Sequence, residues 1–302
     1  MTKSRHAAHN DKRAIFCLAV QISLVLLFIG GGASRAQNTG ESSTSRALSV
    51  MTFNIRYDNP QDGPDRWYER KPRTMQVLAR LKPDVIGLQE ALLNQVDDLL
   101  TSFPSYSALG VGRDDGRCAG EYSAIFYDTT RLQALRSDTF WLSETPEIPA
   151  SNQWGMGCVR ICTWAHFKDL KTGKFFYLYN THLDHKSQPG REKSAALILD
   201  RIRKRAPKDP VLLTGDFNTS ESNPVSTTIR AAGYRDTFRV IHPDATEVGT
   251  TNAFKETTEP NKIDYVYVDD DWEVHQADIV RDKVDGRWIS DHLPVTAAVA
   301  LR

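Results

Sequence analysis

Cysteine is scarce in this chain of 302 residues, which contains four. Cys17 lies near the N-terminus, and the other three leave room for one disulfide, most simply Cys118 with Cys158 or Cys162. Zinc binding is the alternative for these thiols. No nearby pair of Cys or His residues completes a zinc site around Cys158 and Cys162, so the pattern disfavours it.

Long apolar runs are also lacking. The run near the N-terminus, Ala14 to Ile29, is shorter than the roughly 20 residues that a membrane span needs. It follows several basic residues and precedes Ser34 and Ala36, whose small side chains suit a cleavage site. This order predicts an export signal at residues 1–36. The alternative is an uncleaved membrane anchor through residues 14–32. In both cases we expect an exported protein, periplasmic or secreted.

An excess of basic charge is absent as well. Of the 38 basic and 38 acidic residues, 5 and 1 lie in residues 1–36, which leaves 33 against 37 and a net charge of −4. A protein that binds many phosphates of a long nucleic acid usually carries a basic surface. The balance therefore argues against a dedicated nuclease for duplex DNA and favours a small phosphorylated substrate.

Residues 37–46 are rich in Ser, Thr, Gly and Asn without apolar periodicity, which predicts a flexible tether. No linker interrupts residues 47–302, so we expect one α/β domain there. Apolar periodicity predicts helices and strands spread through this domain. The expected helices are Arg73–Leu81, Ala91–Phe103, Arg191–Arg205 and Pro224–Ala232, and the expected strands include Leu48–Ile55, Val85–Leu88, Tyr122–Tyr127, Thr139–Leu142, Val159–Phe167, Phe175–Tyr179, Val211–Thr214 and Lys262–Val268. This order predicts two packed sheets flanked by helices.

Polar side chains stand where several of these strands end or begin. They include amides, carboxylates and imidazoles, namely Asn54, Glu90, Asn180, His182, Asp216, Asn218, Asp264, Asp291 and His292. If the strands deliver these groups to one edge of a sheet, the set suits hydrolysis of a phosphoester. That reaction needs phosphoryl charge neutralised, a water activated and the leaving oxygen stabilised.

Three of these residues are candidates for a metal site. Glu90 follows an apolar strand and offers the hard oxygen that Mg²⁺ prefers, and Asn54 and Asp291 would complete or support the site. Mn²⁺ should substitute, because an oxygen-rich site suits hard cations. Taken alone, a Glu in this position is more often a solvated strand end.

Two further segments suggest acid–base chemistry. Asp216 would act as the base for a nucleophilic water and Asn218 would donate to a phosphate oxygen, although an Asp-Asn turn is the simpler alternative. Asp264 would orient His292 and favour its charged form beside a phosphate. A structural histidine with one backbone bond is the alternative for His292.

The remaining candidates concern the substrate. Asn180 and His182 end an aromatic strand, and His182 would stabilise phosphoryl charge. Arg160 would present its planar guanidinium to the phosphate, or else form a salt bridge at a sheet edge. Asp184 and His185 are as consistent with a polar loop as with a role at the rim of the site.

The ordered set of motifs resembles one superfamily. Residues 53–54, 88–90, 180–182, 215–218, 264 and 290–292 are similar to those of the endonuclease/exonuclease/phosphatase superfamily, which includes DNase I-like enzymes. The resemblance spans about residues 47–302. It implies a four-layered α/β sandwich with the active site at one end of two sheets and a divalent metal, usually magnesium. It also implies that Asn54, Glu90 and Asp291 surround the metal, that Asp216 activates water and that Asp264 orients His292.

The motif Met51–Pro60, with Trp67, Arg70 and Lys71, is similar to a bacterial branch of metal-dependent hydrolases. Relatives often carry a Thr-Phe-His-Gly-Phe-like string where this chain has Thr250–Phe254, so a substrate contact near Asn252 is expected to differ.

The sequence thus predicts an exported Mg²⁺-dependent phosphodiesterase or phosphatase, acting by direct attack of water on phosphorus. Its substrate would be a phosphorylated small molecule, a lipid head group or a nucleic acid. We expect a monomer, in contact with a membrane only if the N-terminal segment stays uncleaved. A secreted nuclease and a catalytically silent binding module on the same fold are the alternatives.

Overall fold

The computed structural model describes residues 47–302. The predicted leader at residues 1–36 and the predicted tether at residues 37–46 lie outside the described residues. Within residues 47–302, no helix combines the length and the apolar character needed to cross a bilayer.

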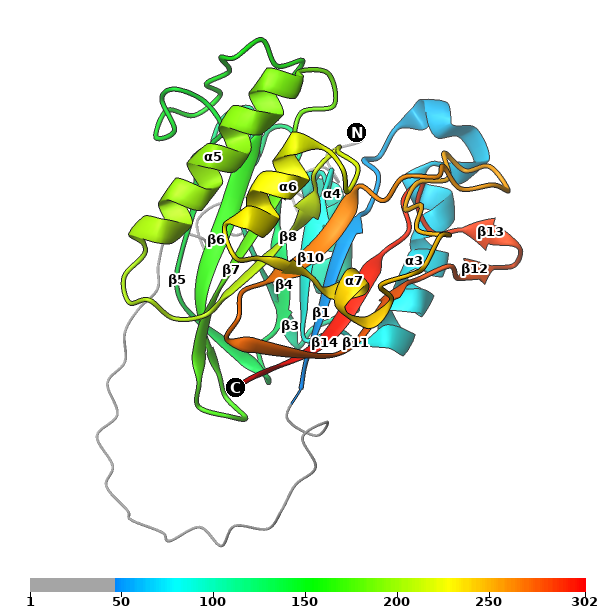
Figure 1. Ribbon diagram of the computed structural model, residues 1–302. Coiled ribbons are helices and arrows are strands. Elements are labelled where there is room, and N and C mark those ends of the chain that lie inside the picture. Colours follow the sequence, from blue (N-terminus) through cyan, green and yellow to red (C-terminus); the bar gives the residue numbers. More distant parts are fainter. Residues whose placement is uncertain (1–46) are drawn as a thin grey trace, which may run out of the picture.

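Two mixed sheets of six strands each form the centre of the molecule (Figure 1). The first has the order β11-β14-β1-β2-β4-β3, and the second has the order β5-β6-β7-β8-β10-β9. The strands of the first sheet are β1 (Leu48–Asn54), β2 (Val85–Gln89), β3 (Tyr106–Leu109), β4 (Ile125–Asp128), β11 (Trp272–Ile279) and β14 (Val295–Leu301). Those of the second are β5 (Leu132–Trp141), β6 (Ile161–Asp169), β7 (Phe175–His182), β8 (Val211–Asp216), β9 (Arg235–Asp236) and β10 (Asp264–Val268). A separate hairpin pairs β12 (Lys283–Val284) with β13 (Arg287–Trp288).

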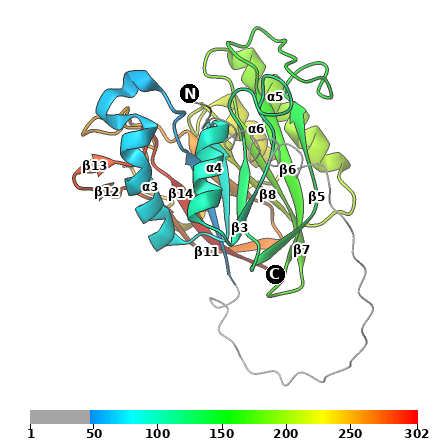
Figure 2. The same ribbon diagram turned by 180° about the vertical axis from the view of Figure 1, so that it is seen from behind.

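Helices cover the two outer faces of the paired sheets, as the front and back views show (Figures 1 and 2). The helices α3 and α4 lie on the outer side of the first sheet, and α5 and α6 lie on the outer side of the second. The helical elements are η1 (Pro60–Asp65), α3 (Trp67–Leu81), α4 (Leu93–Ser102), α5 (Gln188–Lys204), α6 (Pro224–Ala231) and α7 (Thr237–Ile241). This arrangement confirms the predicted four-layered α/β sandwich.

Each strand contributes to two apolar layers because successive side chains point to opposite faces of a sheet. Between the sheets, residues such as Val50 and Ile125 of the first sheet belong to the same cluster as Leu178 of the second. On the outer face of the first sheet, Phe53 and Leu88 belong to a cluster with the buried side of α3 and α4. A third cluster joins the second sheet to α5 and α6. These three layers fix the two sheets relative to each other.

The structure differs from the sequence prediction in several places. Strand β5 runs from Leu132 to Trp141 rather than only over Thr139–Leu142, because it pairs with β6 along its whole length although many of its side chains are polar and exposed. Helix α3 begins at Trp67, six residues earlier than expected, and the short elements β3 and α7 were not predicted. Cys158 and Cys162 are free thiols, so the expected disulfide of Cys118 with one of them is not formed.

Candidate active site

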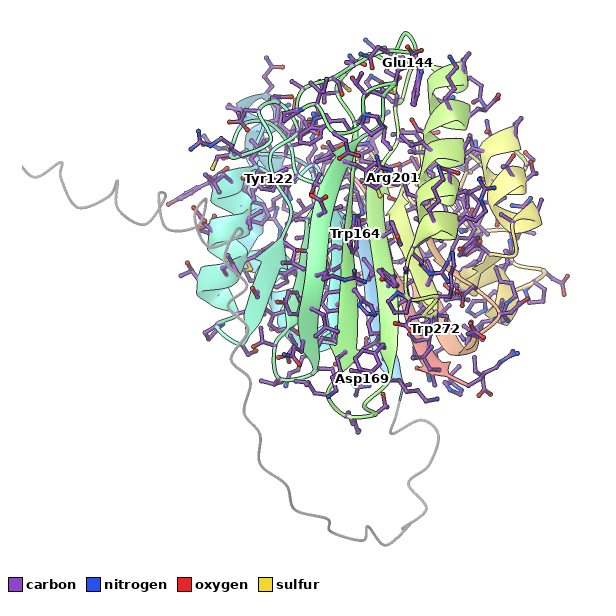
Figure 3. All side chains as sticks on the ribbon, turned by 90° about the vertical axis from the view of Figure 1, so that its left-hand side faces the viewer. Tyr122, Glu144, Trp164, Asp169, Arg201 and Trp272 are labelled. Carbon is purple, nitrogen blue, oxygen red and sulfur yellow. The ribbon has the colours of Figure 1, made fainter. Side chains whose placement is uncertain are left out.

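Strand register brings the predicted polar residues to one end of the sandwich. The parallel strands β1 and β2 pair Asn54 with Gln89, and the parallel strands β7 and β8 pair His182 with Asp216. The antiparallel strand β10 begins with Asp264 directly opposite Asp216. Figure 3 shows the second sheet face-on, with Asp169 at the opposite end of β6 and the loop of Glu144 beyond the end where β7 and β8 stop.

The two sheets approach each other closely just below this end. A Cβ atom at Gly87 would lie 2.3 Å from Oγ1 of Thr214 and 2.5 Å from Oδ1 of Asn180, so only glycine fits at this position of β2. The close approach brings Asn180 of the second sheet into contact with the backbone of the first.

Asn180 has no group left for a substrate. Its Nδ2 donates to the carbonyl oxygens of Leu88 (2.8 Å) and Ala124 (2.9 Å), and its Oδ1 accepts from Nε2 of Gln89 (2.8 Å) and from Oγ1 of Thr214 (3.1 Å). These four bonds use the full capacity of a side-chain amide, and the residue is fully buried. The predicted substrate contact at Asn180 is therefore wrong for this geometry, and Asn180 instead ties the two sheets together below the site.

Asp216 lies at the centre of the predicted site. Its Oδ1 accepts from the backbone N–H of Asn218 at 2.9 Å, and its Oδ2 accepts from Nδ2 of Asn54 at 3.1 Å. The Nε2 atoms of His182 and His292 lie 3.4 Å and 3.8 Å from the same Oδ2. One carboxylate oxygen is thus approached by an amide and two imidazoles from three different segments.

The environment of Asp216 suits a general base. Burial and then the nearby charge of Asp264 raise the pKa of Asp216 to about 7. Both causes act against the charged form of the carboxylate. A base whose pKa lies near the working pH is efficient, because a substantial fraction is deprotonated and the group still binds a proton well.

His292 is held by Asp264 as predicted from the sequence. Its Nδ1 lies 3.0 Å from Oδ2 of Asp264, a fully buried carboxylate. Burial lowers the pKa of His292, but Asp264 and then Asp216 raise it well above its ordinary value. The imidazole is therefore cationic at neutral pH and presents Nε2–H toward the space beside Asp216.

His182 has the opposite electrostatic environment. Burial, followed by the nearby charges of Arg160 and Arg113, lowers the pKa of His182 well below its ordinary value. The imidazole is thus neutral at physiological pH. It lines a small cavity together with Arg160, Arg113 and Glu121, whose carboxylate holds Arg113 by two bonds of 2.7 and 2.8 Å.

Glu90, Asn54 and Asp291 lie together on the first-sheet side of Asp216. Nδ2 of Asn54 donates to Oε1 of Glu90 at 3.0 Å as well as to Asp216. Burial raises the pKa of Asp291, and the nearby charge of Glu90 acts in the same direction. Two carboxylates in contact with solvent are the hard oxygen donors that Mg²⁺ or Mn²⁺ requires.

Asn54 was predicted to complete or support the metal site, and its contacts fit the supporting role. Its Oδ1 accepts the backbone N–H of Arg56 at 3.0 Å, and its amide nitrogen, not its oxygen, faces the acidic residues. Asn54 therefore orients Glu90 and Asp216, and direct binding of a metal by its oxygen does not fit this geometry. Glu90 and Asp291 remain the residues that would hold the cation.

Asp216, Asp264 and His292 form a second cluster of potential ligand atoms, all within 4.8 Å of one another. In this cluster Asp264 and His292 already bind each other. The mutual contacts fit an acid–base relay better than an ion site.

Arg160 lies between the site and its rim. It is buried, its Nη2 lies 3.2 Å from Nδ1 of His185, and its Nε lies 3.9 Å from Oδ2 of Asp184. Nε and Nη1 are buried without a hydrogen-bond partner among the described residues. Arg160 thus carries unpaired buried donors near His182, and His185 contacts it from the solvent side.

Asp184 is a structural residue. Its carboxylate accepts the backbone N–H groups of Gly157 (2.9 Å), Lys186 (3.0 Å) and Ser187 (2.7 Å). Cys158, Asp184 and His185 place ligand atoms within 4.8 Å of one another. The guanidinium of Arg160 already supplies the positive charge in this cluster, so its geometry does not favour a cation.

Asn218 and Asn252 support the site from two sides. Nδ2 of Asn218 donates to the carbonyl oxygen of Leu183 at 2.9 Å, while its backbone N–H holds Asp216. The backbone N–H of Asn252 donates to the carbonyl oxygen of Asp291 at 2.8 Å, and its Nδ2 reaches the carbonyl oxygen of Ser290 at 3.2 Å. Thr250–Phe254, the segment that differs from the string often found in relatives, thus supports the backbone that carries Asp291.

Sequence reasoning missed Arg70. Its guanidinium is fully buried and donates to the carbonyl oxygens of Ile55 (2.5 Å), Ile289 (3.2 Å) and Arg56. It therefore joins the segment after β1 to the segment before Asp291. The signal was present in the sequence, because Arg70 lies four residues before Thr74 and seven before Val77 and so shares their buried helix face.

Three non-glycine residues of the site adopt left-handed backbone conformations. These are Arg56 (φ 58°), Glu90 (φ 63°) and Asn218 (φ 50°). Such conformations cost free energy and persist where surrounding contacts impose them, which is common at active sites.

Comparisons with known proteins agree with this fold. Residues 51–292 match the model of the endonuclease/exonuclease/phosphatase family. The fold is similar to the crystal structure of an endonuclease/exonuclease/phosphatase from Bacteroides vulgatus, with 37% identity, coverage of 85% of this chain and 99% of that chain, and a TM-score of 0.79.

Two further solved structures are similar over nearly their whole length. A mannosyl-6-phosphatase from Bacteroides thetaiotaomicron is 32% identical, with coverage of 84% of this chain and 100% of that chain and a TM-score of 0.78. A conserved protein of unknown function from Enterococcus faecalis is 34% identical, with coverage of 84% and 100% and a TM-score of 0.77. The chain therefore belongs to the endonuclease/exonuclease/phosphatase family, whose members hydrolyse phosphoester bonds and generally depend on divalent metals.

Proposed function

We propose that this protein is an exported phosphoester hydrolase that depends on Mg²⁺ and uses Asp216 to activate the attacking water. The observation that carries the proposal is the position of Asp216, a buried carboxylate with a raised pKa between two imidazoles and next to Glu90 and Asp291. Export rests on the sequence of residues 1–36, and Mg²⁺ rests on the oxygen donors of the site.

The residues divide the reaction among them. Asp216 accepts the proton of the water, and Asn54 and Asn218 hold its carboxylate in place. Cationic His292 donates to a phosphoryl oxygen, and neutral His182 donates from Nε2 on the other side. A cation bound by Glu90 and Asp291 would supply charge neutralisation on the phosphoryl group.

The substrate we propose is a phosphorylated small molecule, with a sugar phosphate as the first candidate. The similarity to a mannosyl-6-phosphatase at 32% identity supports this choice. The net charge of −4 outside residues 1–36 supports it too, because a nuclease gains affinity from basic surface.

The test is a substrate screen with the purified protein and Mg²⁺, using sugar phosphates, phosphodiesters, nucleic acids and phospholipids. We expect release of phosphate from sugar phosphates, loss of activity in EDTA and recovery with Mg²⁺ or Mn²⁺. Asp216→Asn serves as the inactive control. Full turnover after exhaustive chelation, or equal turnover by Asp216→Asn, would overturn the proposal.

A further inference from the structure

Arg56 lies in a backbone turn that shapes the acidic side of the site. It lies two residues after Asn54, the last residue of β1, and has a φ of 58°. Its backbone N–H donates to Oδ1 of Asn54 at 3.0 Å, and the next N–H, of Tyr57, donates to Oε2 of Glu90 at 3.2 Å. Nε2 of Gln95 donates to the carbonyl oxygen of Arg56 at 2.8 Å. The turn is therefore held by main-chain bonds that do not involve the Arg56 side chain.

The side chain of Arg56 is fixed by a separate set of contacts. Nε and Nη2 both donate to the carboxylate of Asp62 at 2.9 Å, and Nδ2 of Asn59 donates to the same carboxylate at 2.9 Å. The guanidinium also lies 4.7 Å from the ring centroid of Tyr57. Because two nitrogens of the planar guanidinium are held, the direction of its third nitrogen is fixed.

That third nitrogen, Nη1, points into the site. It lies 3.5 Å from Oδ2 of Asp291, and 23% of the Arg56 side chain is exposed. The hydrogen bond to Asp62 raises the pKa of Arg56, and the charges of Asp291 and Glu90 raise it further. Arg56 is therefore a permanent, solvent-accessible positive charge beside the two carboxylates that would hold the metal.

A fixed positive charge in this place has two opposite effects. It repels a bare divalent cation from Glu90 and Asp291, because like charges a few ångströms apart interact by kilocalories even near a protein surface. It attracts a phosphate group, to which Nη1–H can donate a charge-assisted hydrogen bond. The charges of a bound phosphate and a bound metal offset each other, so each ligand should bind better in the presence of the other.

We propose that Arg56 is a phosphate-binding residue, locked by Asp62, that makes metal binding and substrate binding depend on each other. The inference rests on the proposed function, because it assumes a divalent cation at Glu90 and Asp291 and a phosphoryl group next to it. Arg56 thereby becomes part of the substrate site, and Asp62 holds its side chain in place. A contact from Arg56 fits the terminal phosphate of a monoester or its product, inorganic phosphate.

The test compares Arg56→Met with the wild-type protein by isothermal titration calorimetry. Mn²⁺ alone should bind Arg56→Met about 3- to 10-fold more tightly, because a repelling charge is gone. Inorganic phosphate, titrated in saturating Mn²⁺, should bind it about 10-fold or more weakly, because a charge-assisted hydrogen bond is lost. Arg56→Lys keeps the positive charge but loses the planar guanidinium. It should leave the affinity for Mn²⁺ within about twofold of wild type and weaken the binding of phosphate.

A matched control is Arg80→Met, since Arg80 lies on α3 with a side chain that is 57% exposed and pairs with Asp282. It should change neither affinity. Thermal melting of each variant shows that the fold is kept. The opposite signs separate this role from a structural one, because a disturbed turn would weaken Mn²⁺ binding as well.

Failure of this inference is distinguishable from failure of the proposed function. A wild-type protein that binds no Mn²⁺ would overturn both. A wild-type protein that binds Mn²⁺ and phosphate, with Arg56→Met showing unchanged phosphate affinity or weaker Mn²⁺ affinity, would overturn the role of Arg56 alone. Coupled shifts of opposite sign, absent in Arg80→Met, support it.

Discussion

Two histidines approach the same oxygen of Asp216, yet their surroundings make them chemically different. Nε2 of His182 lies 3.4 Å and Nε2 of His292 lies 3.8 Å from Oδ2 of Asp216. Buried Asp264 holds His292 and keeps it charged, whereas burial and the nearby guanidinium of Arg160 keep His182 neutral.

The difference shows that a residue's role follows from its neighbours. Glu90 and Asp291 make one part of the site acidic and would hold the cation, whereas Asp264 and then Asp216, both of the second sheet, raise the pKa of His292. Burial and then the charges of Arg160 and Arg113 lower the pKa of His182, which leaves a neutral imidazole that can donate one hydrogen bond. In the proposed function these groups would surround a phosphoryl group with a metal, a cationic imidazole and a neutral donor.

The largest effect should follow replacement of Asp216, whose carboxylate both histidines approach. In Asp216→Asn the amide cannot take a proton from water, so we expect kcat to fall by about 10³-fold, within the usual range for a general base. Circular dichroism and melting should stay close to wild type, because Asn can keep the bond from the Asn218 N–H. Turnover within tenfold of wild type would refute the role.

Replacement of the charged histidine should have the next largest effect. His292→Gln removes a cationic donor, and hydrogen bonds from charged groups are worth roughly 1.5–3 kcal/mol, so we expect a loss of about 100-fold in kcat. Steady-state kinetics with saturating Mg²⁺ measures it. An equal loss in His182→Gln would show that the two imidazoles do not differ in charge.

Replacement of the neutral histidine should cost less. His182→Gln keeps a neutral donor of similar length, and a neutral hydrogen bond is worth about 1 kcal/mol, so we expect a loss of about fivefold to tenfold in kcat. The same assay measures it beside His292→Gln. If His182→Gln is the more damaging of the two, our assignment of roles is reversed.

The pH dependence should report the base. Burial and Asp264 raise the pKa of Asp216 to about 7, so in the absence of metal the deprotonated form is gained as pH rises through that value. A bound cation favours the carboxylate, so kcat/KM should rise with a midpoint at or somewhat below this pH. A rate that falls as pH increases across the same range would contradict a base with this pKa.

The smallest effect on chemistry should come from replacing Asn180, whose side-chain amide joins the two sheets. Asn180→Leu leaves buried partners such as Gln89 and Thr214 without their bonds, so we expect a loss of about 2–4 kcal/mol in stability by urea unfolding. The KM of the folded enzyme should change by less than about threefold, because Asn180 contacts no substrate. A large rise in KM without loss of stability would restore the original prediction.

Much of the fold was readable from the sequence because its signals are local. Short apolar, β-branched or aromatic runs located β1, β2, β7 and β8, and helical spacing located α4 and α5 within three residues at each end. The predicted strand at β5 was too short because many of its side chains are polar, so the sequence shows no alternation of apolar and polar residues. Only pairing with β6 defines the length of β5. The residues of the site were found because they follow strands whose ends meet.

Roles within the site were less predictable. Asn54 and Asn180 look alike in sequence, as amides that end or nearly end an apolar strand. Their partners come from residues far along the chain, and these partners consume the groups expected to bind metal and substrate. Helical spacing places Arg70 on the buried face of α3, but no local pattern shows that Arg56 lies next to Asp291 or that Arg70 contacts Ile289, since both contacts span more than 200 residues.

The sequence by itself determined the sandwich, the family and the set of side chains at one end of the sheets, because periodicity and strand-end motifs are local properties of the chain. Only the tertiary structure decided which carboxylate is buried, which imidazole is charged and which arginine faces the acidic pair. Charge, burial and hydrogen-bond capacity depend on neighbours brought together by packing, and no local pattern encodes those neighbours.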